Sequence, residues 1–292
     1  MGAFYMMMIL GMQIIQTYFS KKASSMFPTS LNGRAKYMAL LFGCSSLLAL
    51  LLLVGGTQGQ FDWLTVALAT AAGITLVAVQ FCKLLAMQNG TMVITSVFST
   101  AGLIIPCVCG VLFFEETMTV GQWGGIAVFI FASFLLISSA KNIYSSFSWK
   151  TIFLLLGVFI ANGGTMLCQK ALTYVNPEGS VTLFSFFSFA VPAVAFGAYL
   201  LIAGEKGGQE KLEKGLYAPA VLLAAAMFVI NQLVTMATSY VPTAILFTVP
   251  NGANNIFAAL MAAVLFKEKL TVRSVLGLVL SIISFVWVRN VL

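Results

Sequence analysis

Phe114-Glu-Glu-Thr-Met-Thr-Val120 is matched 152 residues later by Phe266-Lys-Glu-Lys-Leu-Thr-Val272. Aligned without a gap, the flanking stretches 91–134 and 243–286 share ten of 44 positions. Apolar residues match by chance in a hydrophobic chain, so the matched Glu, Thr and Gly positions carry more weight. They include Glu116 with Glu268, Thr119 with Thr271, and Gly125 with Gly277. The two stretches indicate an internal duplication.

The composition indicates an integral membrane protein. Hydrophobic residues make up 60% of the chain and charged residues 8%, whereas soluble domains average roughly 25% charged residues. Its apolar stretches are about 20 residues long, which is enough to cross a hydrocarbon core of roughly 30 Å. The sequence therefore predicts an all-α integral membrane fold with ten transmembrane helices. They are expected at 2–20, 35–54, 63–87, 91–113, 120–140, 151–172, 180–203, 217–240, 243–266 and 272–290.

The duplication divides the ten segments into two five-helix repeats, 1–145 and 146–292, within one membrane domain. Because each repeat has an odd number of spans, the second repeat must enter the membrane with the opposite orientation. Membrane proteins built from inverted repeats are typically transporters. Their substrate site lies near the midplane between the repeats, and rocking of one repeat against the other gives alternating access.

The basic residues predict an orientation in the membrane. Twelve of the 15 Lys and Arg residues fall on one side of the predicted spans. The positive-inside rule places that side in the cytoplasm and both termini outside it. Lys22, Arg34 and Lys170 lie near span ends, where each is either a gate residue or a topological anchor. The compact chain favours a bacterial inner membrane.

Several classes of function are excluded by composition. The chain has no His, and its five cysteines all fall inside apolar segments, so we expect no metal, no cofactor and no disulfide framework. No constellation of catalytic side chains is found, which argues against an enzyme. The basic residues follow the membrane side and do not form a cluster, so no nucleic-acid partner is expected.

The paired motifs resemble those of the EamA-like branch of the drug/metabolite transporter superfamily. Residues 114–125 are similar to the acidic turn and Gly-bearing helix of that family, and residues 265–277 repeat the pattern. Lys22 is similar to the Lys that closes the first span in the family, and Arg34 to the Arg near the start of the second. Lys170 occupies the position of Lys22 in the second half. The resemblance covers essentially the whole chain and implies a ten-span transporter. It also implies cytoplasmic termini, opposite to the charge-based prediction.

Polar side chains inside the predicted spans are the candidate substrate site. Such groups are costly in a membrane and need a partner, a cavity or a function. Each could form an interhelical hydrogen bond worth about 0.6 kcal/mol, but their density at midmembrane depth favours a cavity. The candidates are Gln13, Gln16, Gln80, Lys83, Ser96, Thr100, Asn162, Gln169, Asn231, Gln232, Asn251, Asn254 and Asn255.

Lys83 has two interpretations. It binds an anionic group of the substrate, or its long side chain extends to the cytoplasmic rim of the membrane. The acids of the duplicated motif, Glu116 and Glu268, lie in turns between spans, where they are expected to cap helices. No Asp or Glu lies within a span, which favours facilitated diffusion or exchange over proton-driven transport.

These features predict a secondary transporter of a small polar metabolite, with an amino acid or similar zwitterion favoured. The alternatives are an exchanger for organic anions, sugar phosphates or nucleotide sugars and, from another class, a membrane scaffold or channel-like subunit. The expected partners are a small-molecule substrate and the lipid bilayer, with the protein acting as a monomer or homodimer.

Overall fold

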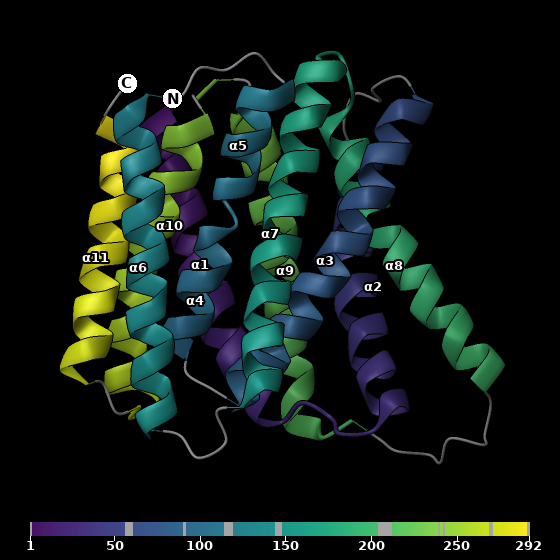
Figure 1. Cartoon of the computed structure of the whole chain (residues 1–292). Coiled ribbons are helices and arrows are strands. Elements are labelled where there is room, and N and C mark those ends of the chain that lie inside the picture. The colour runs from purple at the N-terminus through teal and green to yellow at the C-terminus, as the bar shows by residue number, and fades with distance from the viewer. Residues whose placement is uncertain are drawn as a thin grey trace.

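The described part of the chain is helical throughout (Figure 1). The structure is a computed structural model that describes residues 2–55, 61–89, 92–113, 119–143, 148–203, 212–238, 240–241, 243–268 and 271–290. The helices are α1 (Gly2–Ser25), α2 (Leu31–Gly55), α3 (Trp63–Asn89), α4 (Met92–Ala101), α5 (Ile104–Phe113), α6 (Val120–Ile143), α7 (Trp149–Val175), α8 (Val181–Ala203), α9 (Lys214–Ala237), α10 (Thr243–Val264) and α11 (Val272–Asn290). The prediction of an all-α fold is confirmed.

Six helical segments of the described chain are long and apolar enough to cross a membrane. They are α2, α3, α4 together with α5, α7, α8 and α9. Large apolar side chains point away from the bundle, including Leu51, Trp63 and Val194, which are 71%, 76% and 70% exposed. An outer surface of this kind suits contact with lipid, since soluble monomers rarely expose extended apolar patches.

The fourth predicted span, 91–113, agrees with a candidate membrane span over Met92–Phe113, but the helix is interrupted within it. It is two helices, α4 and α5, separated by Gly102 and Leu103. Proline has no N–H group, so Pro106 cannot donate to the carbonyl of Gly102, four residues before it. The N–H groups of Gly102 and Leu103 donate to carbonyls three residues back, at 3.2 and 3.0 Å, in a tighter turn. The span is therefore interrupted near its middle.

The helices pair in a pattern that relates the two halves. Under the predicted division into two repeats, α1, α2, α3 and α6 would correspond to α7, α8, α9 and α11, and α4 with α5 to α10. The third span of each half packs on the first span of the other: α3 on α7, and α9 on α1. Other pairs join counterparts: α2 with α8, α6 with α11, and α4 with α10. In addition, α3 packs on α8, α2 on α9, and α1 on α10, so the main helix contacts combine both halves.

The two ends of the bundle differ in charge. Both chain termini lie at one end (Figure 1). The opposite end has the loops and helix ends that bear the described lysines Lys21, Lys22, Lys150, Lys214 and Lys267. We call it the basic end.

Candidate functional site

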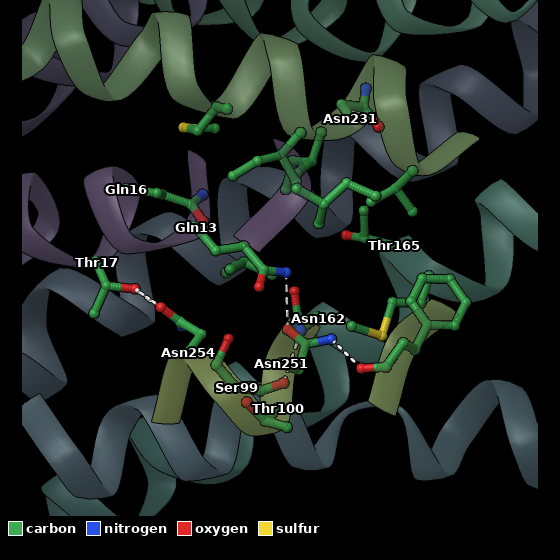
Figure 2. A pocket seen from close by; sticks show the side chains of 18 of the residues that line it. Gln13, Gln16, Thr17, Ser99, Thr100, Asn162, Thr165, Asn231, Asn251 and Asn254 are labelled. Atoms are coloured by element: carbon green, nitrogen blue, oxygen red, sulfur yellow. Dashed lines mark hydrogen bonds between the residues drawn. The ribbon is translucent and has the colours of Figure 1, made fainter. Parts of the chain in front are cut away.

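A polar cavity of about 90 Å³ lies inside the bundle (Figure 2). Helices from both halves line it: α1, α3 and α4 from the first, and α7, α9 and α10 from the second. Its polar lining residues are Gln13, Gln16, Thr17, Gln80, Lys83, Ser96, Ser99, Thr100, Asn162, Thr165, Gln169, Asn231, Asn251 and Asn254. Apolar side chains such as Ile9, Met166 and Phe247 complete the wall.

The cavity brings together eleven of the thirteen residues predicted from the sequence. Among them are Asn251 and Asn254, whose spacing of three residues places them on one face of α10. Thr17, Ser99 and Thr165 also line the cavity and were not predicted. A lone Ser or Thr in a helix gives a weak signal, because its hydroxyl can bond a carbonyl of its own helix, as Thr165 does with Ala161.

Two predicted residues lie outside the cavity. Gln232 faces α8, where its Oε1 accepts a hydrogen bond from Ser185 at 2.8 Å and its Nε2 donates to Thr182 at 3.2 Å. Asn255 is fully buried and accepts a hydrogen bond from the Thr100 hydroxyl on α4 at 3.1 Å. Both side chains form hydrogen bonds between helices, which is the alternative to a substrate-binding role that the sequence left open for each polar side chain.

A chain of hydrogen bonds fixes the orientation of two amides from different halves (Figure 2). The Asn251 Nδ2 group donates to the backbone carbonyl of Phe247 at 2.6 Å. A carbonyl can only accept, so the Asn251 Oδ1 atom must face away from it, and there it accepts from Gln13 Nε2 at 3.0 Å. The Oε1 atom of Gln13 is consequently left buried without a partner among the described residues.

Further amide contacts surround the cavity. Asn254 Nδ2 donates to the Thr17 hydroxyl at 3.2 Å, which joins α10 to α1. Gln169 Nε2 donates to Asn231 Oδ1 at 2.6 Å, which joins α7 to α9. Like the bond between Gln13 and Asn251, the Asn254 contact crosses between the halves, so its geometry depends on how the halves are packed.

The interruption between α4 and α5 contributes a backbone group to this site. Asn162 Nδ2 donates to the carbonyl of Ser99 at 2.7 Å, just before the interruption. The approach is close because two glycines face each other: a Cβ atom on Gly102 would lie 2.7 Å from the Gly163 nitrogen, and one on Gly163 would lie 2.6 Å from the Gly102 oxygen. Only glycine fits at either position.

Lys83 is the charged residue that lines the cavity. It is 5% exposed, so its ammonium does not extend to the rim of the bundle, and that interpretation of the sequence is wrong. Among the residues that the structure describes, no Asp or Glu lines the cavity. The described residues offer the ammonium no hydrogen bond or ion pair, although buried charges in proteins are normally paired.

The three predicted gate or anchor residues do not line the cavity. Lys22 is exposed at the end of α1, and Lys170 is buried in α7. Arg34 donates from Nε to the carbonyl of Pro28 at 2.8 Å, and its guanidinium lies over the rings of Phe27 and Phe81. These contacts make Arg34 an anchor of the turn between α1 and α2.

An ion pair joins different helices at the basic end. Lys21 Nζ lies 2.7 Å from Glu268 Oε1 and donates to the carbonyl of Met87 at 3.0 Å. Both carboxylate oxygens of Glu268 accept from the N–H of Met92, the first residue of α4, at 3.2 and 3.1 Å. The pair links the first half to the turn after α10 in the second.

Glu268 caps a helix as expected, but the helix belongs to the other half. The N–H of Ser274 in α11 is bonded by the Thr271 hydroxyl at 3.2 Å. Lys267, with a φ of 50°, turns the chain after α10 so that Glu268 points back under the bundle. Glu116 of the first motif lies outside the described residues.

The described residues contain no group of three or more Cys, Asp or Glu side chains placed to hold a metal ion. All five cysteines are free thiols. The site therefore offers hydrogen bonds from amides and hydroxyls, one ammonium group and an apolar wall. This chemistry suits reversible binding of a small polar molecule.

Comparisons with known proteins agree with this architecture. A family model described as the EamA-like transporter family matches residues 148–290. No curated protein matches the chain. Among 28 matching chains of solved structures, one described as "Crystal structure of protein" has a TM-score of 0.69 and 9% identity, and the match covers 99% of both chains. At that identity the likeness shows the fold alone, and it extends over the whole chain.

Proposed function

Because this chain belongs to the EamA-like transporter family, a family of multi-pass membrane transporters and not of enzymes, we propose that it moves a small polar metabolite by alternating access. The observation that carries the proposal is the cavity, which the first, third and fourth spans of both halves line. Substrate sites of transporters with inverted repeats typically lie at such an interface between repeats.

The helix pairing supports two inverted repeats. A two-fold axis relating the halves requires that any contact between α3 and α7 be repeated between α9 and α1, and both contacts occur. It also requires that helices beside the axis meet their own counterparts, as α2 and α8 do. With five spans per half, that axis lies in the membrane plane.

The cavity favours a small cargo. A buried water needs about 10–15 Å³ of such volume, so about 90 Å³ holds roughly six to nine waters. That space suits an amino acid or another small zwitterion, which the amides and hydroxyls could bind. Organic anions are the second candidate, because Lys83 lines the cavity. Nucleotide sugars are too large for the cavity in this conformation.

We further propose that the basic end faces the cytoplasm of a bacterial cell, with both termini outside, as the positive-inside rule predicts. The bonds between Gln13 and Asn251 and between Lys21 and Glu268 would then break and reform as the halves rock. The protein is proposed to act as a monomer or homodimer, since one chain supplies the whole cavity lining.

Counterflow into proteoliposomes tests the proposal. A carrier preloaded with unlabelled substrate takes up labelled substrate transiently against its gradient, and the flux saturates. A channel-like subunit gives unsaturable flux without overshoot, and a scaffold gives none. Either of those outcomes with a broad panel of small metabolites would reject transport by alternating access.

A further inference from the structure

We propose that the cargo carries a carboxylate group and that Lys83 is the residue that binds it; this inference rests on the proposed transport function. Lys83 is the one charged side chain among the described residues that line the cavity, and it is 95% buried. A cation removed from water needs a counter-charge. Because the described residues supply none, the cargo is the group that can.

A single cation favours a carboxylate over a phosphate. A phosphate monoester carries a charge of about −1.5 to −2 at neutral pH, so one lysine would leave much of that charge buried without compensation. A carboxylate bound to Lys83 compensates the lysine charge: a 2-hydroxy acid leaves the site neutral, and a zwitterionic amino acid leaves only the charge of its own ammonium, which neutral acceptors can bind. Charge-assisted hydrogen bonds of this type are also among the stronger ones in proteins.

The groups around Lys83 define what else the cargo carries. Gln80 lies three residues before Lys83 on the same face of α3, and its Oε1 atom is buried without a partner. The Oε1 atom of Gln13 is likewise unpaired. The Asn251 Oδ1 atom accepts from Gln13 Nε2, so the free side of the Gln13 amide is its oxygen, which is an acceptor. Two unpaired acceptors in the same cavity as this cation suit a carboxylate molecule that also bears hydrogen-bond donors, such as an amino acid or a 2-hydroxy acid.

The experiment uses purified wild-type protein and pairs of probes. Small L-amino acids and 2-hydroxy acids are each compared with their primary amides, which keep the donors but lack the carboxylate. Ligand-induced thermal stabilisation reports binding, and counterflow in proteoliposomes reports transport. We expect acids to stabilise the protein and to be transported, with the amides weaker by roughly 30-fold or more. The ranking of amino acids against hydroxy acids identifies the second group of the cargo.

Three variants assign the effect to Lys83. Lys83→Met should weaken binding of the acids by roughly 30-fold or more and bring acids and amides to similar affinity. The substitution should also raise the melting temperature of the empty protein, because it removes an unpaired buried charge. If Lys83 had only a structural role, the same substitution would lower the melting temperature. Lys83→Arg should keep a preference for acids. Lys150→Met, which removes an exposed lysine in the first turn of α7, should change neither measurement.

The outcomes separate the two proposals. Wild-type protein that transports amides as well as acids, or a Lys83→Met variant that still binds acids within about threefold of wild type, overturns the carboxylate inference and leaves transport standing. Wild-type protein that shows no counterflow with any acid, amide, amine or sugar overturns the transport function itself, and the inference with it.

Discussion

Lys21 and Glu268 form a 2.7 Å ion pair that joins the end of α1 to the turn after α10, at the basic end of the bundle. The Glu268 carboxylate also bonds the first N–H of α4, and Lys21 bonds the last turn of α3. Three segments of one half therefore meet a turn of the other half at this point. In a rocking mechanism, this pair must separate before the cavity opens towards the basic end.

Glu268→Gln should favour opening at that end. Losing a partly buried charge-assisted bond costs about 1–2 kcal/mol, or roughly 5- to 30-fold in the population of the closed state. A cysteine placed at Ser96, in a background whose five free cysteines are replaced, should react correspondingly faster with an impermeant maleimide applied from the basic side. Lys22→Gln removes the neighbouring exposed lysine and should leave the rate unchanged. Equal rates in all three proteins would show that the ion pair has no gating role.

Asn231 and Gln232 provide a matched pair of amides on α9. Asn231→Ala removes a cavity-lining group and the partner of Gln169, so we expect transport to fall about tenfold, the effect of losing one hydrogen bond of about 1.4 kcal/mol. Gln232→Ala removes a contact with α8 and should lower stability by about 0.6 kcal/mol. Its counterflow per folded molecule should stay within about twofold of wild type. The reverse ranking would place the site on the α8 side.

Gly163→Ala should destabilise the bundle. Its Cβ would lie 2.6 Å from the Gly102 oxygen and 2.8 Å from the Ile105 Cβ, so helix α7 would be forced away from the interrupted span. Overpacking of this kind costs about 1–3 kcal/mol. Gly11→Ala, in α1, meets open space and should be neutral or stabilising by up to about 1 kcal/mol. Thermal unfolding in detergent compares the two, and similar melting temperatures would contradict the close approach.

The outline of the fold and most cavity residues were predictable from the sequence, because apolar length and polar spacing are local properties. Asn251 and Asn254 illustrate this, since a spacing of three residues places both on one helix face whatever the neighbours are. The choice between Asn231 and Gln232 was not predictable in this way. Adjacent residues point about 100° apart, and which one faces the cavity depends on how α8 packs against α9.

The contacts at the basic end could likewise not be predicted from the sequence, because helix packing decides which side chain faces inward. Lys21 and Lys22 are adjacent residues of the same type, so the sequence does not distinguish them, yet Lys21 forms an ion pair with Glu268 and Lys22 is exposed. The interruption at Gly102 is an intermediate case. Pro106 indicates which carbonyl lacks its regular donor four residues on, and that carbonyl, of Gly102, accepts from the N–H of Ile105 at 3.0 Å instead. The presence of Gly163 opposite it follows only from the packing of α7.

Acid should weaken the packing of α3 on α7 through Asp62. The backbone N–H of Thr65, with further bonds from its hydroxyl and from Asn176, holds the pKa of Asp62 below its usual value. A lowered folded-state pKa contributes stability above the unfolded-state pKa of about 3.9, and this contribution is lost as pH falls through the lower value. Between pH 5 and about pH 3, the melting temperature of Asp62→Asn should therefore fall less than that of wild type. Glu178→Gln, at an exposed position near by, should follow wild type.

Reporter fusions test the proposed orientation. A periplasmic reporter fused after Leu292 should be active, and one inserted in the loop between α8 and α9 should be inactive. Cytoplasmic reporters should give the opposite pair of results. A cytoplasmic signal at Leu292 would show that the protein keeps the orientation usual in its family and that the charge distribution is misleading.

The isolated ammonium of Lys83 has a consequence for the kinetics of turnover. With a monoanionic carboxylate such as a 2-hydroxy acid bound, the centre of the protein is electrically neutral, and the halves can close around it without enclosing a net charge. Without cargo, the same closure would enclose a lone positive charge at a cost of several kcal/mol. Return of the unloaded protein should then be the slow step, it should respond to membrane voltage, and cargo on the far side should accelerate the cycle.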